Sequence, residues 1–160
     1  MGMMKTLNRL EKRILLQLLD DCTQTMSVIA SKVGTTRQTV ANKINHLMDS
    51  GVIHGFSAQV NPESLGLGLR AFILIREEPD IDFRKDNEEV LRSLEQISGF
   101  YYVFGRHDVV LEVFIKSNEE LKSLVETIHS LHGIRETETM IFHGIVKDER
   151  ETPIISVLKR

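Results

Sequence analysis

The chain has 160 residues, of which 41% are hydrophobic and 27% charged, a composition typical of one globular domain or two small ones. No apolar run approaches the roughly 20 residues that a membrane-spanning helix needs, and the N-terminal segment lacks the apolar core of an export signal, so we expect a soluble cytoplasmic protein with no membrane partner. The single cysteine, Cys22, excludes an internal disulfide and a cysteine-based zinc site.

The net charge of −3 is unevenly distributed along the chain. Residues 1–61 contain seven Lys and Arg against four Asp and Glu, whereas residues 62–160 contain 13 against 19. The N-terminal part is therefore mildly basic and the remainder acidic, which is typical of a protein in which only one part attracts phosphate.

The first 34 residues predict two helices. Apolar residues recur at three- and four-residue spacing, and Asn8 with Glu11 forms a capping-box pattern before them. The apolar positions of this first helix are Leu7, Leu10, Ile14, Leu15, Leu18 and Leu19. Thr25 is placed to cap a second, short helix that ends at Gly34. Its expected inward residues are Val28, Ile29 and Val33.

A third helix is predicted between Thr36, its N-cap, and Gly51. Its buried positions are expected to be Val40, Ile44, Leu47 and Met48. The tight turn at Gly34 between the second and third helices is typical of a helix-turn-helix, whose third helix lies in the DNA major groove.

The outward residues of this third helix suit DNA recognition. Arg37 can bind guanine, and Gln38 and Asn42 can pair with adenine, while threonines and a lysine suit phosphates. The predicted DNA-binding residues are Thr36, Arg37, Gln38, Thr39, Asn42, Lys43 and His46. The alternative is an ordinary solvated polar face on a helical bundle.

Residues 52–60 are strand-like, with apolar residues separated by small or polar ones, and they predict a wing and a hinge strand that ends at Asn61-Pro62. The following residues 63–68, with two glycines, predict a linker.

The remaining residues alternate between strand and helix patterns. They predict strands over 69–75, 100–104, 109–115 and 134–146, and helices over 87–97 and from Asn118 to Gly133. The order βαββαβ is that of a ferredoxin-like domain. Residues 154–158 could add an edge strand. Because the helices cover one face of such a sheet, the other face is expected to pack against a second copy.

The predicted fold class is therefore α+β, with a winged helix-turn-helix domain followed by a ferredoxin-like domain. The expected boundaries are 1–52 for the helix-turn-helix, 53–66 for the hinge strand and linker, and 67–160 for the ferredoxin-like domain.

Three stretches of the chain resemble a known family: residues 7–15 (LNRLEKRIL), residues 33–40 (VGTTRQTV) and residues 47–62 (LMDSGVIHGFSAQVNP). They are similar to the leucine-responsive regulatory protein/AsnC (Lrp/AsnC) family, the feast/famine transcriptional regulators. The resemblance covers nearly the whole chain. It implies a regulator, not an enzyme, that binds pseudo-palindromic double-stranded DNA as a homodimer, tetramer or octamer, with no cofactor.

The resemblance also implies a small effector, commonly an amino acid, held between dimers near a Gly-x-x-Asp turn and the last long strand. The turn is present at residues 105–108. The implied effector residues are Gly105, His107, Asp108, Thr137, Thr139 and Met140. The turn departs from the family pattern at Phe104 and Val109, where a small polar residue and a tyrosine are usual.

The turn can serve a ligand in physical terms, because backbone N–H groups beside a glycine can hold a carboxylate and Asp108 can take an ammonium group. The alternative is that Gly105 and Asp108 only satisfy the hairpin backbone.

Two other functions stay open. An enzyme resembling siroheme decarboxylases would share both halves, but it needs a basic stretch rich in His and aromatic residues, and this chain has no Trp and only Tyr101 and Tyr102. The other alternative is a ligand-sensing assembly module without DNA binding, but it does not explain why the third helix has residues suited to DNA contact, such as Arg37 and Gln38. His129 and His132 are spaced as a metal pair without a third ligand, so no metal site is predicted.

Overall fold

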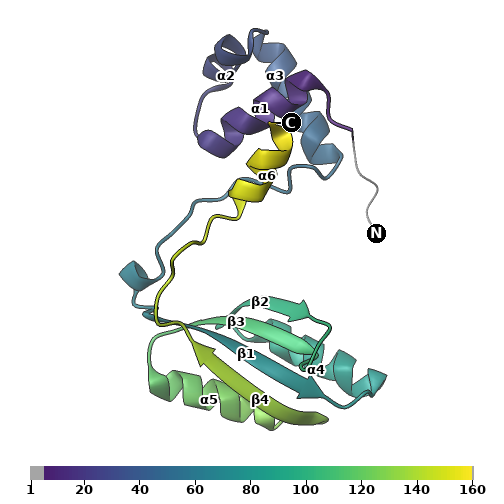
Figure 1. Cartoon of the computed structure of the whole chain (residues 1–160), viewed down its shortest axis with the longest axis vertical. Coiled ribbons are helices and arrows are strands. Elements are labelled where there is room, and N and C mark those ends of the chain that lie inside the picture. The colour runs from purple at the N-terminus through teal and green to yellow at the C-terminus, as the bar shows by residue number, and fades with distance from the viewer. Residues whose placement is uncertain (1–5, 160) are drawn as a thin grey trace. The chain divides into compact units, whose positions relative to one another are not determined.

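The computed structural model describes residues 6–159 (Figure 1). Residues 1–5, on which the expectation about an export signal rests, lie outside the described part, as does residue 160. The chain divides into two compact units, Met1–Ala58 with Lys147–Arg160, and Gln59–Val146. The C-terminal segment, which we expected in the ferredoxin-like domain, is thus grouped with the N-terminal unit. No helix in the described part is long and apolar enough to cross a membrane.

The first unit contains helices α1 (Arg9–Asp20), α2 (Met26–Val33), α3 (Arg37–Asp49) and α6 (Glu151–Leu158). The capping box is present, because the Asn8 side chain accepts from Glu11 N and the Glu11 carboxylate accepts from Asn8 N. Thr25 and Thr36 cap α2 and α3. Gly34 ends α2 with a φ of 70°, a left-handed conformation that favours glycine. The three predicted helices are therefore confirmed.

The core of this helical unit is smaller than predicted. Its main cluster consists of Ile14, Ile29, Ala30, Val33, Val40 and Ile44. Val28 and Met48, which we expected to be buried, are 44% and 42% exposed. These two expectations were wrong because each helix buries one narrow stripe, and Ile29 and Leu47 already occupy the inward positions.

The strand predicted after Gly51 is not formed. Residues 53–60 have no regular secondary structure, and Phe56 and Val60 are 50% and 60% exposed. A strand needs a neighbour for its backbone hydrogen bonds, and none of the described strand pairs involves this segment. A short 3₁₀ helix, η1 (Glu63–Leu65), follows and ends at Gly66.

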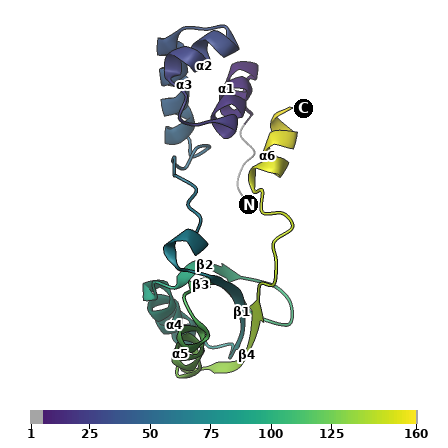
Figure 2. The ribbon, with the colours of Figure 1, turned by 90° about the vertical axis from the view of Figure 1, so that its left-hand side faces the viewer.

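The second unit has the predicted βαββαβ order. It comprises β1 (Leu69–Glu77), α4 (Ile81–Ser93), β2 (Ile97–Tyr102), β3 (Val109–Ile115), α5 (Asn118–His129) and β4 (Ile134–Ile141). The sheet order is β2-β3-β1-β4, and all neighbouring strands are antiparallel. Figure 2 shows α4 and α5 on the same side of the sheet. The ferredoxin-like arrangement is confirmed.

Alternation along the central strands divides this sheet into two faces. Ala71, Ile73 and Ile75 of β1 are fully buried beneath the helices. The residues between them, Arg70, Phe72 and Leu74, lie on the opposite, open face and are only partly buried. The core contains Leu91, Leu121, Leu124 and Ile128 from the two helices.

Helix α4 begins six residues earlier than predicted. The Asp80 side chain accepts hydrogen bonds from Asp82 N and Phe83 N, so Asp80 is the N-cap and Asp82 lies in the first helical turn. The helix ends at Ser93, four residues before the predicted residue 97, which is the first residue of β2. At α5, Ser117 is the cap, one residue before the predicted Asn118.

The predicted C-terminal edge strand is wrong, because Glu151–Leu158 form helix α6. Pro153 lies in its first turn, where a residue without an N–H breaks no helical hydrogen bond. The last strand of the sheet, β4, also ends at Ile141, earlier than the predicted residue 146.

Candidate nucleic-acid interface and effector site

The N-terminal half of α3 presents a polar face to solvent. Arg37, Gln38 and Asn42 are exposed, whereas Val40 and Ile44 on the opposite side are fully or nearly buried. The Thr36 side chain accepts from Thr39 N at 3.2 Å, which fixes the start of the helix. Threonines 36 and 39 also share a hydrogen bond of 2.9 Å between their hydroxyl groups.

The two predicted adenine readers contact one another. Gln38 Nε2 donates to Asn42 Oδ1 at 2.9 Å, one helical turn away. Side-chain amides can exchange such a bond for the paired donor and acceptor of adenine. The bond therefore orients the two amides on one face of α3.

Lys43 has a structural partner that we did not foresee. Its Nζ lies 2.9 Å from Glu11 Oε1, and the Glu11 side chain is only 7% exposed. Because Glu11 also closes the capping box of α1, the Lys43–Glu11 pair joins α3 to α1. The Lys43 ammonium group, which we expected to contact phosphate, is thus already paired with the buried carboxylate of Glu11.

One residue of this face was missed. Asn45 is exposed and lies three residues after Asn42, beside the predicted DNA-binding residues. Residues 38, 42 and 45 follow the i, i+4, i+7 spacing of one helical face, a signal that could have identified it. Exposed His46 lies beside it.

The predicted effector turn connects β2 to β3. Its Asp108 side chain accepts from Glu77 N at 3.0 Å through Oδ2, and its Oδ1 lies 3.7 Å from Arg84 Nη2. Glu77 and Arg84 are themselves paired at 3.1 Å. Asp108 therefore ties the turn to the end of β1 and to α4, and these partners lie outside the β2–β3 hairpin itself.

His107 lies on the open side of the same turn. It is 9% exposed, and its Nε2 is buried without a hydrogen-bond partner among the described residues. A carboxylate oxygen, Oε2 of Glu138 on β4, lies 3.5 Å from this nitrogen. An imidazole nitrogen in this position can still accept or donate a bond.

The sheet separates the predicted effector residues. On β4, Thr137 pairs with Ile75 and Thr139 with Ile73, so both threonines lie on the helix side of the sheet. Consistent with this, His129 Nε2 of α5 lies 2.5 Å from Thr137 Oγ1. Met140 pairs with Phe72 and lies on the open face. The six residues therefore do not form one cluster within a single chain.

The two histidines noted in the sequence have separate contacts. His129 contacts Thr137, whereas the ring of His132 stacks on Phe83 with a centroid distance of 5.9 Å.

Comparison with known families assigns both units. Residues 7–54 match the family model described as winged helix-turn-helix DNA-binding. Residues 70–152, more than half of the chain, match the model described as the Lrp/AsnC ligand binding domain. This chain belongs to the Lrp/AsnC family. It is a transcriptional regulator with a helix-turn-helix DNA-binding domain and a ligand-binding domain, as the resemblance implied.

Relatives of this regulator match over nearly their whole length. An HTH-type transcriptional regulator of Pyrococcus abyssi is 34% identical over 152 residues, covering 93% of this chain and 97% of that protein. A feast or famine regulatory protein from M. tuberculosis, solved in complex with L-methionine, is 28% identical with a TM-score of 0.82, covering 91% and 97%. E. coli AsnC shares the fold, with 23% identity and a TM-score of 0.82, covering 90% and 97%.

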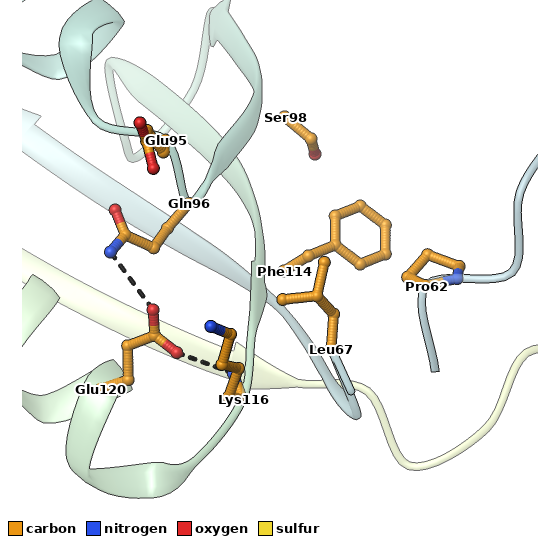
Figure 3. A pocket seen from close by; sticks show the side chains of 8 residues that line it. All are labelled: Pro62, Leu67, Glu95, Gln96, Ser98, Phe114, Lys116 and Glu120. Atoms are coloured by element: carbon orange, nitrogen blue, oxygen red, sulfur yellow. Dashed lines mark hydrogen bonds between the residues drawn. The ribbon is translucent and has the colours of Figure 1, made fainter. Parts of the chain in front are cut away.

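A pocket of this Lrp/AsnC chain lies away from the effector turn. It has a volume of about 400 Å³. Figure 3 shows Glu120 accepting from Gln96 Nε2 and from the backbone of Lys116 in its wall. Its lining residues are Pro62, Leu67, Glu95, Gln96, Ser98, Phe114, Lys116 and Glu120. None belongs to the predicted effector set, because the turn begins β3 and the pocket lies at its other end.

The Lys43–Glu11 pair predicts acid sensitivity of the helical unit. The hydrogen bond from Lys43, followed by that from Asn8 N, holds the pKa of Glu11 below its ordinary value of 4.5. A carboxylate whose pKa is depressed on folding contributes stability above its unfolded pKa and loses it as pH falls through the folded pKa. We expect thermal unfolding of this unit to shift to lower temperature between about pH 5 and pH 3.

The measurement is thermal unfolding followed by circular dichroism and by amide signals of α1 and α3. Glu11→Gln is expected to flatten the pH dependence, whereas Asp49→Asn, at an exposed position of α3, is the matched control. An equally steep loss of stability in Glu11→Gln and wild type contradicts the assignment.

Proposed function

We propose that this regulator binds pseudo-palindromic operators as a homodimer or larger assembly of dimers, and that a small metabolite such as an amino acid modulates it. The observation that carries the DNA-binding proposal is the capped N-terminal half of α3, polar and exposed on one side and buried through Val40 and Ile44 on the other. A helix held in this way can enter a major groove without rearranging its own core.

We propose distinct roles for the residues of α3. Arg37 pairs with a guanine, and Gln38 and Asn42 read adenines. Thr39 and His46 contact phosphates, and Thr36 positions the helix by capping it. Lys43 adds positive charge near the backbone but acts mainly through Glu11.

The open face of the sheet supports the dimer. Phe72 and Phe142 pack edge to face there, with ring centroids 4.9 Å apart. The Arg70 guanidinium lies 4.7 Å from the Phe142 centroid and pairs with Glu112, whose residue is 4% exposed. The aromatic part of this face, with the Arg70–Glu112 ion pair inside it, can meet its own copy across a two-fold axis. Two copies of α3 related by that axis match a palindromic site.

The effector proposal rests on the turn at residues 105–108. The M. tuberculosis relative was solved with L-methionine, which supports an amino acid as the ligand class. His107 and Met140 lie on the open side of the sheet, whereas Asp108, Thr137 and Thr139 lie on the helix side. A ligand between two copies can therefore contact one set from each.

Selection of genomic DNA fragments by the purified protein tests the DNA-binding proposal. Enrichment of one motif with two-fold symmetry, together with a dimer or larger species in light scattering, is the expected result. Recovery of fragments with no shared motif, or a monomer at working concentration, contradicts it.

The effector proposal predicts a calorimetric result. Titration of the twenty amino acids into the protein is expected to give binding for at least one of them, and Asp108→Ala is expected to weaken it about tenfold by removing a charge-assisted contact. Glu89→Ala, at an exposed position of α4, is the control. Absence of heat with every amino acid would retire the hypothesis. If Asp108→Ala binds the amino acid as tightly as wild type, Asp108 has only its structural role, the contacts with Glu77 and Arg84.

A further inference from the structure

The C-terminal helix α6 packs into the helical unit. Leu158 is 7% exposed and lies in a buried cluster with Leu15 of α1 and Leu47 of α3. Partly buried apolar residues surround this cluster: Leu7, Leu16, Leu19, Val52 and Ile53. Figure 2 shows α6 beside α1. The helix-turn-helix family model ends at residue 54 and the ligand-binding model at residue 152, so neither describes this packing.

Two separate clusters hold the recognition helix. The N-terminal half of α3 is held by Val40 and Ile44 in the core of α1 and α2. The C-terminal half is held by Leu47, which is 1% exposed in the cluster that contains Leu158. One of the two supports of α3 therefore comes from the far end of the chain.

We infer that α6 is an integral part of the DNA-reading unit and that Leu158 is a positioning residue for α3. Leu158 is buried in one cluster with Leu15 of α1 and Leu47 of α3, so it acts on DNA affinity through the placement of Leu47. Removing it exposes Leu15 and Leu47 on one side and frees the C-terminal half of α3 to move. Because only the correctly placed helix binds, the apparent affinity equals the intrinsic affinity multiplied by the fraction of molecules in which the helix remains in place.

The same connection gives the ligand-binding unit a second covalent route to the DNA-reading unit. The chain enters the second unit before β1 and leaves it after β4, and residues 142–150 lead from β4 directly to α6. β4 carries three of the proposed effector residues. If the proposed effector function holds, a change at β4 reaches α3 through α6 and Leu158 as well as through the first linker.

The helix supplies its own matched control. Val157 is the residue next to Leu158, but it is 64% exposed on the outer side of α6. Leu158→Ala and Val157→Ala remove apolar groups from the same helix, one from the cluster and one from the surface. Leu158→Met restores apolar volume at the buried position.

The test measures the affinity of the full-length variants for the selected operator by fluorescence anisotropy, with hydrogen exchange of the α1 and α3 amides as the second readout. Leu158→Ala is expected to weaken binding about tenfold and to speed exchange in the C-terminal half of α3. Val157→Ala is expected to stay within about twofold of wild type, and Leu158→Met to recover most of the lost affinity.

An affinity for Leu158→Ala equal to that of Val157→Ala, with unchanged exchange in α3, overturns the inference. If Leu158→Ala unfolds the helical unit while Leu158→Met folds and binds, α6 is integral to that unit, as inferred. If Leu158→Met folds but fails to bind DNA, an apolar side chain at this position is not sufficient to place α3, and the role inferred for Leu158 is overturned. Should wild type bind no DNA, the proposed function fails, and the exchange of α3 amides still decides whether Leu158 places the helix.

Discussion

Replacing Arg37 with alanine is expected to weaken binding to the selected operator by about 1–3 kcal/mol, the usual contribution of an arginine paired with guanine. Arg37 is the first residue of α3 and is exposed. Its side chain makes no hydrogen bond or ion pair with residues 6–159. The loss should be largest for operators with the preferred guanine and should relax selectivity at that base pair.

The control for Arg37→Ala is Arg92→Ala. Arg92 also lies on a helix surface, but it belongs to the second unit, where it pairs with Glu88 one turn away. Its replacement removes the same charge without touching α3. Equal affinity of Arg37→Ala and wild type would remove Arg37 from the base-reading set. Equal weakening of all sequences would assign it to phosphate instead.

Replacing Ile73 with alanine is expected to have the largest effect on stability. Ile73 is fully buried at the centre of β1, paired with Leu111 on β3 and Thr139 on β4. A buried isoleucine truncated to alanine loses its transfer free energy and leaves a cavity, which together cost about 2–5 kcal/mol. Urea denaturation, with amide exchange to report on each unit separately, measures the change in the free energy of unfolding.

Val90→Ala is the matched comparison for Ile73→Ala. Val90 is an apolar residue of α4 in the same unit, but it is 39% exposed. Its truncation is expected to cost less than about 1 kcal/mol, as substitutions near the surface usually do. Similar losses in the two variants would show that β1 is not the centre of this core.

Local signals in the sequence predicted the helical elements well. The capping box at Asn8, the caps at Thr25 and Thr36 and the turn at Gly34 all involve residues within four positions of one another. The residues that form these hydrogen bonds can therefore be recognised from a short stretch of sequence. The period-two and helical patterns of the second unit predicted its βαββαβ order for the same reason.

Elements whose state depends on distant partners were the ones predicted wrongly. Residues 53–60 have a strand pattern but no strand beside them, so they remain irregular. Ile154, Ile155 and Val157 have high strand propensity, yet they lie in α6 because Leu158 finds its cluster on α1 and α3. No pattern within either segment contains that information.

The exposed face of the candidate DNA-binding site was predictable from the sequence, but the partners of its charged residues were not. Helical periodicity placed Arg37, Gln38 and Asn42 on one exposed face, as observed. The partner of Lys43, however, lies 32 positions away at Glu11, and that of Asp108 lies 31 positions away at Glu77. Such pairs are set by tertiary packing. Local patterns therefore selected Lys43 and Asp108 for contact with DNA or ligand, although both side chains already have partners within the chain.

The most direct test of the DNA-binding account is an NMR titration of the isotope-labelled protein with a selected operator duplex. We expect the largest changes in backbone and side-chain signals at Arg37, Gln38 and Asn42, with those of β1 and β3 unchanged. Saturable binding of the duplex that leaves the α3 signals in place, and moves those of another surface, would contradict the central claim that this helix reads DNA.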